Sequence, residues 1–354
     1  MTLPLNNYIG CIIGGAVGDA LGAPTEFKGT YELQEKYGPN AVNDFIEYED
    51  GKGEITDDTQ MLLFTADGLL RAYNRAIEKG IGGAYLTYCY EAYLRWLYTQ
   101  NDWHSEKALE KVRLNGWLVK QDFLHKRRAP GQTCLTALCS RKIGTIQNPI
   151  NDSKGCGGIM RIAPVGLIYA NNTETAFKMG AEIAAITHGH PSGYLSSGYL
   201  SALIFMLNRG FNLQIAIDNC LAILSTYSNH QETTEAIKDA LALHSEGEPD
   251  YYKVNKLGQG WVGEEALAIS LYCALCYSND FEKAINLAIN HDGDTDSTGA
   301  ITGNILGLIL GEEAIPQRWL NNLNNYNEIK QVALDLYDAA NNNTESDWRR
   351  RFMD

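Results

Sequence analysis

Apolar residues recur along most of the chain at intervals of three and four residues, which is the period of an amphipathic α-helix. The clearest examples are residues 60–70, 181–186, 198–207 and 266–276. Alternating β-branched residues, the usual mark of a strand, are almost absent. The pattern predicts an all-α fold, a compact orthogonal bundle of about a dozen or more helices, with a short irregular or β segment near residues 43–53.

Polar capping residues mark several expected helix starts. These residues are Asp57, Ser105, Thr173, Asn212 and Asp280. Their side chains accept hydrogen bonds from the N–H groups that the first turn of a helix leaves unpaired. We therefore expect a helix to begin at or beside each of them.

Two of the helical segments carry a glycine at every fourth position. The eight glycines are Gly10, Gly14, Gly18 and Gly22 in the first segment and Gly299, Gly303, Gly307 and Gly311 in the second. This spacing puts the four glycines of each helix on one face, where the missing side chains let two backbones approach closely. A glycine inside a helix costs up to about 1 kcal/mol, so these positions need a packing reason. We predict that both helices lie in the crowded centre of the bundle.

The composition fits a folded protein and argues against nucleic acid as a partner. The chain has 354 residues, of which 45% are hydrophobic, and no Pro-, Ser- or Gly-rich linker divides it. We therefore predict one domain over residues 1–354. The net charge is −14, whereas nucleic-acid surfaces collect Lys and Arg. The one basic cluster, residues 126–128, is interpreted as a solvated helix end.

No segment has the pattern of a membrane or export signal. The N-terminus lacks the basic residues of a secretory signal. The apolar stretches 9–23 and 301–310 are shorter than the ~20 residues that span a bilayer. We expect a soluble, cytoplasmic protein with no membrane partner.

Two short acidic loops are the strongest chemical signal. Residues 56–59 read Thr-Asp-Asp-Thr and residues 292–297 read Asp-Gly-Asp-Thr-Asp-Ser, and each precedes an apolar helix. Either loop alone fits a helix cap with acids in the first turn, and the second alone also fits a single calcium site. Brought together, their carboxylates would repel unless cations lay between them, and oxygen donors select hard ions such as Mg²⁺, Mn²⁺ or Ca²⁺. The combination indicates a metal site, which two ions could share.

A series of motifs in fixed order resembles the ADP-ribosylglycohydrolase family over about residues 8–310. The motifs are residues 14–27 (GGAVGDALGAPTEF), 55–59 (ITDDT), 130–134 (PGQTC), 157–161 (GGIMR), 187–191 (THGHP), 260–262 (GWV) and the second acidic loop. Three positions depart from the common family pattern. Asp292 replaces a glycine, Ser297 replaces a threonine and Cys156 replaces an asparagine.

The resemblance implies an all-α hydrolase that removes ADP-ribose from a modified protein, with ADP-ribosyl-arginine the favoured substrate. It implies two Mg²⁺ ions, with Mn²⁺ as a substitute, held by Thr56, Asp57, Asp58, Asp294, Asp296 and Ser297. The catalytic residues it implies are Glu26, Asp58 and Asp294. Glu26 would position the substrate or act in acid/base chemistry near the anomeric carbon, because cleaving a glycosidic bond needs proton delivery to the leaving group.

The resemblance also assigns a set of residues to the ADP-ribose ligand. They are Glu26, Gly131, Thr133, Gly155, Cys156, Gly157, Gly158, Met160, His188 and Trp261. Residues 154–158 precede a helical run expected from Ile159, and the amides of a helix N-terminus suit a diphosphate. His188 would face the ligand cleft and His190 would support the turn. Trp261 could stack on adenine or lie in the core, and Arg161 could be a structural ion-pair residue.

Three other functions remain open from sequence. The chain could bind ADP-ribose without turnover, or hydrolyse another N- or O-glycoside. It could also be an immunity protein that neutralises an ADP-ribosylating toxin partly by direct binding. A P-loop NTPase, a kinase and a serine hydrolase are disfavoured, because the G-x-x-x-x-G-K-[ST], H-R-D and G-x-S-x-G motifs are absent.

Overall fold

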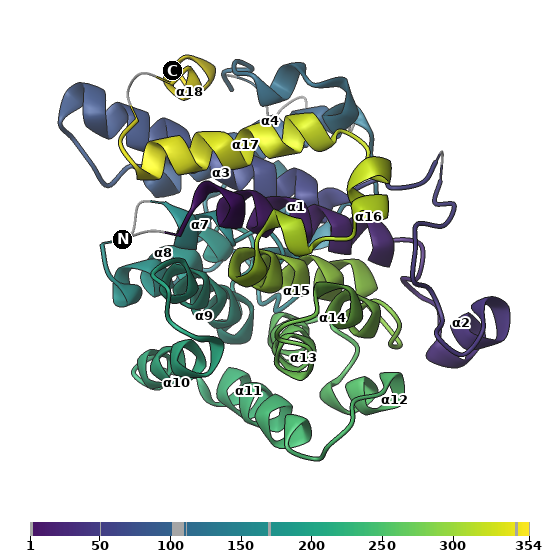
Figure 1. Ribbon diagram of the computed structural model, residues 1–354. Helices are drawn as coiled ribbons and strands as arrows, with labels where there is room; N and C mark the ends of the chain where they lie inside the picture. Colours follow the sequence, from purple (N-terminus) through teal and green to yellow (C-terminus); the bar gives the residue numbers. More distant parts are fainter. Residues whose placement is uncertain are drawn as a thin grey trace.

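Two glycine-striped helices, α1 (Leu5–Gly22) and α15 (Thr295–Leu310), lie against each other in the middle of the protein (Figure 1). The computed structural model describes residues 3–49, 51–100, 110, 112–168, 171–343 and 346–353. The other α-helices are α2 (Thr30–Tyr37), α3 (Asp57–Lys79), α4 (Tyr85–Thr99), α6 (Gln132–Cys139), α7 (Pro164–Leu167), α8 (Thr173–Ala185), α9 (Pro191–Asn208), α10 (Leu213–Leu224), α11 (Gln231–His244), α12 (Tyr251–Val254), α13 (Gly263–Cys276), α14 (Phe281–Ala288), α16 (Gln317–Asn322), α17 (Tyr326–Ala340) and α18 (Trp348–Arg351). Single 3₁₀ turns are η1 (Leu118–Lys120), η2 (Asp122–His125), η3 (Cys156–Gly158), η4 (Asn255–Leu257) and η5 (Glu312–Ala314). The predicted all-α fold is confirmed.

The glycines account for the closeness of α1 and α15. A Cβ atom on Gly303 would lie 2.0 Å from the carbonyl oxygen of Gly14, and one on Gly307 would lie 1.9 Å from that of Gly10. Further along, a Cβ on Gly18 would lie 2.1 Å from the carbonyl oxygen of Gly299. These distances are far below van der Waals contact, so any side chain would push the helices apart. The predicted packing role is confirmed.

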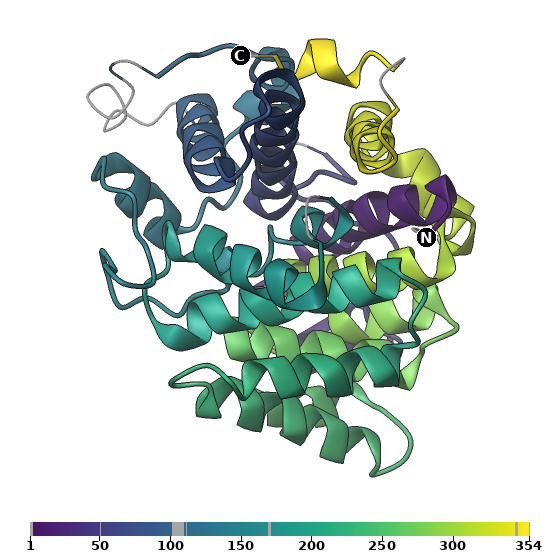
Figure 2. The same ribbon diagram turned by 90° about the vertical axis from the view of Figure 1, so that its left-hand side faces the viewer.

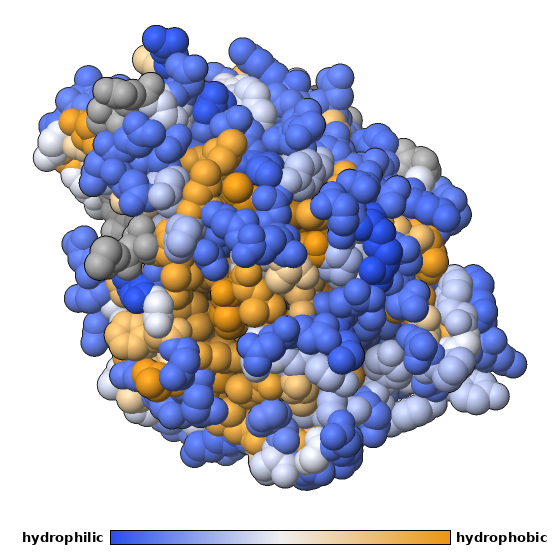
Figure 3. All heavy atoms as spheres, viewed as in Figure 1, coloured by the Kyte–Doolittle hydropathy of each residue, from blue (hydrophilic) through white to orange (hydrophobic). Residues whose placement is uncertain are grey.

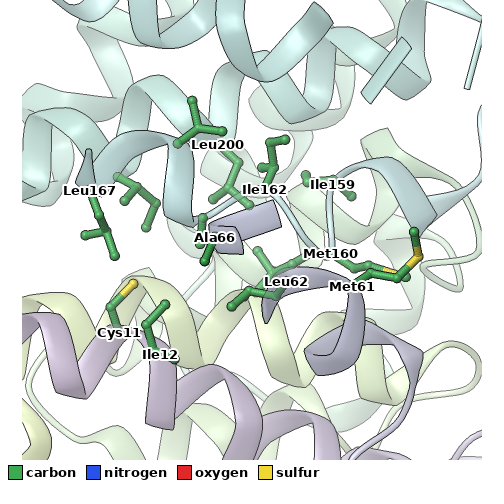
Figure 4. Packing of buried hydrophobic residues seen from close by; sticks show 14 of the residues in the cluster. Cys11, Ile12, Met61, Leu62, Ala66, Ile159, Met160, Ile162, Leu167 and Leu200 are labelled. Carbon is green, nitrogen blue, oxygen red and sulfur yellow. The ribbon is translucent and has the colours of Figure 1, made fainter. Parts of the chain in front are cut away.

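The remaining helices surround this pair in the two views of Figures 1 and 2. Helix α17 packs on α1, α3 pairs with α4, and α8 pairs with α9. Figure 4 shows Cys11 and Ile12 of α1 close to Leu62 and Ala66 of α3, inside one large cluster of buried side chains. The core therefore fixes α3 relative to α1, and this matters because α3 begins at the first acidic loop.

Two expected helix starts are confirmed and two are displaced by one residue. Asn212 caps α10 and Asp280 caps α14 through their side chains. The caps of α3 and α8 are instead Thr56 and Asn172, because their side chains reach the backbone N–H groups of the first turn. The expected start at Ser105 lies outside the described residues.

The described residues of the segment 43–53, which are 43–49 and 51–53, are irregular, as expected. They contain one isolated bridge, Tyr48 to Gly51, and no strand ladder is present in the described parts of the chain. On the face shown in Figure 3, apolar side chains gather in the centre and lower left, and the upper part is mostly polar. No described helix is both long enough and apolar enough to cross a membrane.

In the basic cluster at residues 126–128, Lys126 and Arg127 are exposed after η2, which fits the interpretation as a solvated helix end, but Arg128 does not fit it. The Arg128 side chain is only 1% exposed and its Nη1 lies 2.9 Å from Oε2 of Glu54. The two residues are far apart in sequence, and the tertiary fold buries them as an ion pair. Arg128 thereby fixes the segment that contacts the first acidic loop.

Candidate active site

A buried aspartate of α1 holds the first acidic loop. Asp19 accepts hydrogen bonds from the backbone N–H groups of Thr56 and Thr59, each at 3.1 Å, and from the Thr56 hydroxyl at 2.9 Å. Burial and then the charge of Asp296 raise the pKa of Asp19 to about 7. Sequence reasoning gave Asp19 no role, although a carboxylate in an otherwise apolar and glycine-rich helix was a signal for one. Asp19 is the residue that ties α1 to the start of α3.

The first loop is held in place and keeps one carboxylate oxygen unused. Thr56 caps α3 by accepting a hydrogen bond from the N–H of Asp58 at 3.2 Å. The carboxylate of Asp57 accepts from the N–H of Gly131 at 3.0 Å, so Gly131 lies beside the first loop, and its predicted contact with the ligand stays a prediction. Oδ2 of Asp58 is buried and has no hydrogen-bond partner among the described residues. A buried carboxylate oxygen without a partner is costly unless it binds something else.

The second loop begins α15 and meets the glycine-rich segment. Asp294 caps the helix by accepting from the N–H of Ser297 at 3.3 Å, and its Oδ2 accepts from the thiol of Cys156 at 2.8 Å. Asp296 also accepts from the N–H of Ser297, at 3.0 Å. Cys156, which stands where the family usually has asparagine, therefore keeps a donor toward Asp294.

Carboxylates from the two loops and from Glu26 converge. Glu26, Asp294 and Asp296 each place one oxygen within 4.8 Å of the other two. Burial, followed by the charges of Asp296, Asp57 and Asp19, raises the pKa of Glu26 to about 9. The pKa values of Asp58 and Asp294 are also well above normal, first because of burial and then because of Asp296.

This donor set fits a hard divalent cation. The oxygens come from closely spaced carboxylates, the carboxylates repel one another, and Asp58 has an oxygen without a partner. Mg²⁺ and Mn²⁺ prefer such ligands. Asp57 and Asp58 are not part of the group formed by Glu26, Asp294 and Asp296, but the same neighbouring charges act on them.

The glycine-rich segment is anchored beside the second loop. Gly155 and Val262 form an isolated antiparallel bridge, in which the N–H of Cys156 donates to the carbonyl of Trp261 at 3.1 Å. Lys154 is already paired with Glu264 at 2.6 Å and with Glu232. The segment can therefore offer backbone groups to a ligand, while its lysine is occupied by carboxylates.

The expectation of a helix from Ile159 is wrong. The N–H groups of Ile159 and Met160 both donate to the carbonyl of Cys156, at 2.9 and 3.1 Å, which closes a tight turn in place of a helix. Helix α7 begins only at Pro164. The Met160 side chain is 2% exposed and packs near Met61 in the core (Figure 4). Its predicted contact with the ligand stays a prediction, and it would have to use the backbone.

Gly157 and Gly158 of the glycine-rich segment pack against buried side chains, and His188 lies against Gly157. A Cβ atom on Gly157 would lie 3.0 Å from Cε1 of His188, and one on Gly158 would lie 3.2 Å from Cβ of Ala184. Burial, with help from Arg161, lowers the pKa of His188 to about 3, so its imidazole is neutral. His188 therefore supports the glycine segment from below.

The neighbours of His188 have structural roles. His190 caps α9 by accepting from the N–H of Ser192 at 3.2 Å, as expected of a residue that supports the turn. Arg161 donates to the Thr187 hydroxyl at 2.7 Å and lies 4.2 Å from the centre of the Tyr93 ring. It has no carboxylate partner in the described part of the chain, so its interpretation as an ion-pair residue is wrong.

Two aromatic rings stack beside Glu26. The rings of Phe27 and Trp261 lie 4.9 Å apart at an interplanar angle of 24°. Phe27 has a left-handed backbone (φ 63°) and is 77% exposed, and Trp261 is half-buried. Trp261 thus lies in the loop next to the site, outside the core. The role of Phe27 was missed, although it directly follows Glu26 in the first family motif.

Thr133 lies between the first loop and the glycine-rich segment. It belongs to the first turn of α6, which begins one residue after Gly131. Its hydroxyl is 3.1 Å from the hydroxyl of Ser153, two residues before Gly155. The structure therefore brings together the acidic residues, Gly131, Thr133, Gly155, Cys156 and Trp261, and it places Gly158 and Met160 in the packing behind them.

Comparisons with known proteins show the family to which the chain belongs. The family model described as ADP-ribosylglycohydrolase matches residues 2–346. An uncharacterized protein of Archaeoglobus fulgidus is 26% identical over 93% of this chain and 95% of its own length. The ADP-ribosylarginine hydrolase Tri1 of Serratia proteamaculans is 24% identical over 95% of this chain and 80% of its own length. An ADP-ribosylglycohydrolase-related protein complex of known structure matches with a TM-score of 0.64 and 25% identity, covering 95% of this chain and 98% of that one. The chain belongs to the ADP-ribosylglycohydrolase family and is a hydrolase of that class.

Proposed function

We propose that this hydrolase removes ADP-ribose from arginine side chains of modified proteins and depends on divalent cations at the acidic loops. The observation that carries the proposal is the convergence of Glu26, Asp294 and Asp296 within 4.8 Å, beside the unpartnered oxygen of Asp58. A site with this density of carboxylates, next to a glycine-rich segment, suits a sugar diphosphate only when cations offset the negative charge.

The residues that would hold two Mg²⁺ ions, with Mn²⁺ as a substitute, are Thr56, Asp57, Asp58, Asp294, Asp296 and Ser297. When bound, such ions orient ribose hydroxyls and stabilise developing charge. Asp19 keeps the first loop in shape by accepting hydrogen bonds from the backbone N–H and the hydroxyl of both Thr56 and Thr59. Cys156 orients the Asp294 carboxylate through its thiol.

Glu26 is the residue that we assign to proton transfer. Its pKa of about 9 leaves the carboxyl group protonated at neutral pH in the metal-free protein. Leaving-group departure from the anomeric carbon needs such a proton donor. Glu26 is placed by the turn that ends α1, where its N–H donates to the carbonyl of Gly22 at 3.1 Å.

The arginine acceptor is the finer part of the proposal. It is supported by the name of the Serratia relative, which is an ADP-ribosylarginine hydrolase. A role in binding ADP-ribose without turnover, a role in toxin immunity, hydrolysis of another glycoside and a cytoplasmic location stay predictions. The single-domain boundary at residues 1–354 also stays a prediction.

The direct test is the release of ADP-ribose from arginine-linked and serine-linked ADP-ribosyl peptides, with Mg²⁺ or with a chelator. We expect release from the arginine-linked peptide. Chelation, or the double change Asp294→Ala and Asp296→Ala, should reduce it by at least about 100-fold, because changes around metal ligands commonly cost 10- to 100-fold. The matched control is Glu235→Ala with Asp239→Ala, which removes two carboxylates from the exposed face of α11 and should leave activity within twofold.

Three results would count against the proposal. Activity that survives chelation would remove the metal requirement. Turnover of the serine-linked peptide alone would make arginine the wrong acceptor. Binding of ADP-ribose with no turnover of either peptide would favour the binding role.

A further inference from the structure

A second region of the protein collects positive charge. A cavity of about 720 Å³ lies between α3, α4 and the segments that flank α6. The arginines that line it are Arg71, Arg75, Arg95, Arg113 and Arg141. They are five of the thirteen arginines in a chain whose net charge is −14. Along α3, Arg71 follows Asp57 by 14 residues, which is about 21 Å at 1.5 Å per residue. The cavity is therefore separate from the acidic loops.

The innermost part of the cavity has an excess of buried positive charge. Asp67 lies between two guanidinium groups, at 3.0 Å from Nε of Arg71 and in contact with Nη2 of Arg95. All three side chains are 2% exposed. Although burial acts to raise it, the two arginines hold the pKa of Asp67 below its usual value. One carboxylate thus faces two buried cations, and a buried charge without a partner is strongly destabilising.

The two buried arginines, Arg71 and Arg95, differ in how many hydrogen-bond acceptors their guanidinium groups have. Arg71 has further acceptors in the carbonyl oxygens of Met353 at 2.8 Å and Asn115 at 3.1 Å. Among the described residues, Asp67 is the only acceptor of the Arg95 side chain, and the buried Nε of Arg95 has no hydrogen-bond partner there. Arg95 is among the residues that line the cavity, and its unused Nε lies buried behind the cavity wall.

The outer part of the cavity also has more positive than negative groups. Arg75 and Arg113 have no hydrogen-bond or ion-pair partner within the described ranges. The carboxylates on the wall are those of Glu91 and Glu110, and Glu110 is paired with Arg141 at 3.7 Å. Five guanidinium groups therefore share the wall with two carboxylates. Asp67, which lies behind the wall, offsets one further positive charge.

The rest of the wall is suited to a small molecule. Tyr88, Tyr90 and Leu94 of α4 line it, and aromatic rings offer flat faces for stacking. Ligand sites for small molecules usually enclose about 300–1,000 Å³, and this cavity lies in that range. Guanidinium groups match phosphate oxygens in paired hydrogen bonds, which makes arginine the usual residue for phosphate recognition.

We propose that this cavity binds a small soluble molecule that carries at least two linked phosphate groups, at a site distinct from that of hydrolysis. The phosphates would contact Arg75, Arg95 and Arg113, and Tyr88 or Tyr90 would pack against the remainder. The same polyphosphate group occurs in free inorganic polyphosphate and in nucleotides, so the test includes both.

The test is calorimetric titration of the full chain with tripolyphosphate in a chelating buffer at low salt. Without divalent cations the acidic loops repel anions, so binding under these conditions reports the arginine cavity. We expect one binding site per chain, and at least a tenfold weaker affinity for the double change Arg75→Ala and Arg113→Ala. The variant should fold, because neither residue has a partner in the described structure. Unfolding midpoints within 2 °C of the parent would confirm it.

The matched control is Arg209→Ala with Lys238→Ala, which removes the same charge from exposed positions outside the cavity. It should bind tripolyphosphate within twofold of the parent, and so should the Asp294→Ala, Asp296→Ala variant. Absence of binding, equal weakening by both basic pairs, or loss of binding in the aspartate variant would overturn the proposal. ADP and adenosine titrations identify the source. If ADP binds more tightly than tripolyphosphate, and the arginine variant loses both, the natural ligand is a nucleotide. If tripolyphosphate binds and ADP does not, the ligand is inorganic polyphosphate.

Discussion

The two parts of α3 gather charges of opposite sign and handle them differently. At its beginning, Asp57 and Asp58 join the carboxylates of α15, and no ion pair within the described ranges involves any of them. Further along, Arg71 and Arg75 lie near Arg95, and Asp67 of the same helix offsets part of their charge. The comparison teaches that a fold supplies its own counter-charge where it needs stability. Where it must bind an ion, it leaves the charges unpaired.

Among the changes that test this comparison, the replacement of Asp67 should change the free energy of unfolding most. In Asp67→Ala, two buried guanidinium groups lose their only carboxylate, and breaking such a pair costs about 3–5 kcal/mol. Urea denaturation should show a loss of this size in the free energy of unfolding. The control Asp239→Ala, on the exposed face of α11, should change it by less than about 0.5 kcal/mol. A loss below about 1 kcal/mol for Asp67→Ala would mean that the arginines do not depend on it.

Neutralising Asp58, at the other end of α3, should instead increase the free energy of unfolding. Asp58 has a raised pKa because of burial and then because of Asp296, Asp57, Asp19 and Asp294. In metal-free protein the change Asp58→Asn removes that repulsion at constant shape and should stabilise the fold by about 1 kcal/mol. Denaturation with a chelator measures this gain, and the same variant should lose most of the stabilisation that Mg²⁺ gives the parent. A destabilised metal-free variant would contradict the account.

The third effect concerns the pH dependence of stability. Burial and then Asp296 raise the pKa of Glu26 to about 9 and that of Asp19 to about 7, whereas unfolded carboxyl groups titrate near 4. Between about pH 4 and pH 9 the folded protein holds protons that the unfolded chain releases, so the free energy of unfolding falls as pH rises. Because one pKa unit corresponds to about 1.4 kcal/mol, we expect a decrease of about 2 kcal/mol from pH 7 to pH 9 with a chelator.

A substitution links this pH dependence to the acidic site. Glu26→Gln should flatten the decrease between pH 7 and pH 9, because the amide does not titrate. The pH dependence that Asp67 contributes is opposite to that of Glu26. Because the pKa of Asp67 is lowered, it contributes stability that is present above about pH 4 and lost below it. A slope above pH 7 that Glu26→Gln leaves unchanged would show that other groups cause it.

Much of the fold could be read from local patterns because helices depend on neighbours in sequence. The caps at Asn212 and Asp280 satisfy N–H groups only three residues away. The glycine spacing of four in two segments was enough to predict that both helices lie in the crowded centre of the bundle, because a stripe without side chains permits close backbone approach. The expected helix at Ile159 failed, because the apolar residues there are buried by a turn that bonds back to Cys156.

The sequence was enough to name the acidic residues of the metal site, since two loops of like charge need a common cation and the motifs match a known family. The arrangement of these residues in space could not be predicted from the sequence. Sequence offered no means to see that Asp19 would hold the first loop, that Phe27 would stack on Trp261, or that Arg128 would be buried against Glu54. Each of these contacts joins residues from different elements.

The sequence by itself determined the helical class, the close packing of the glycine helices in the centre of the bundle and the kind of chemistry, because these depend on period, spacing and residue type. The tertiary structure decided which charges are paired and which are left unpaired. Asp58 and Arg95 are both buried ionisable side chains, but the first faces other carboxyl groups, which raise its pKa, and the second shares a single carboxylate. Burial makes these differences count, because a charge interacts far more strongly with its neighbours once water is removed.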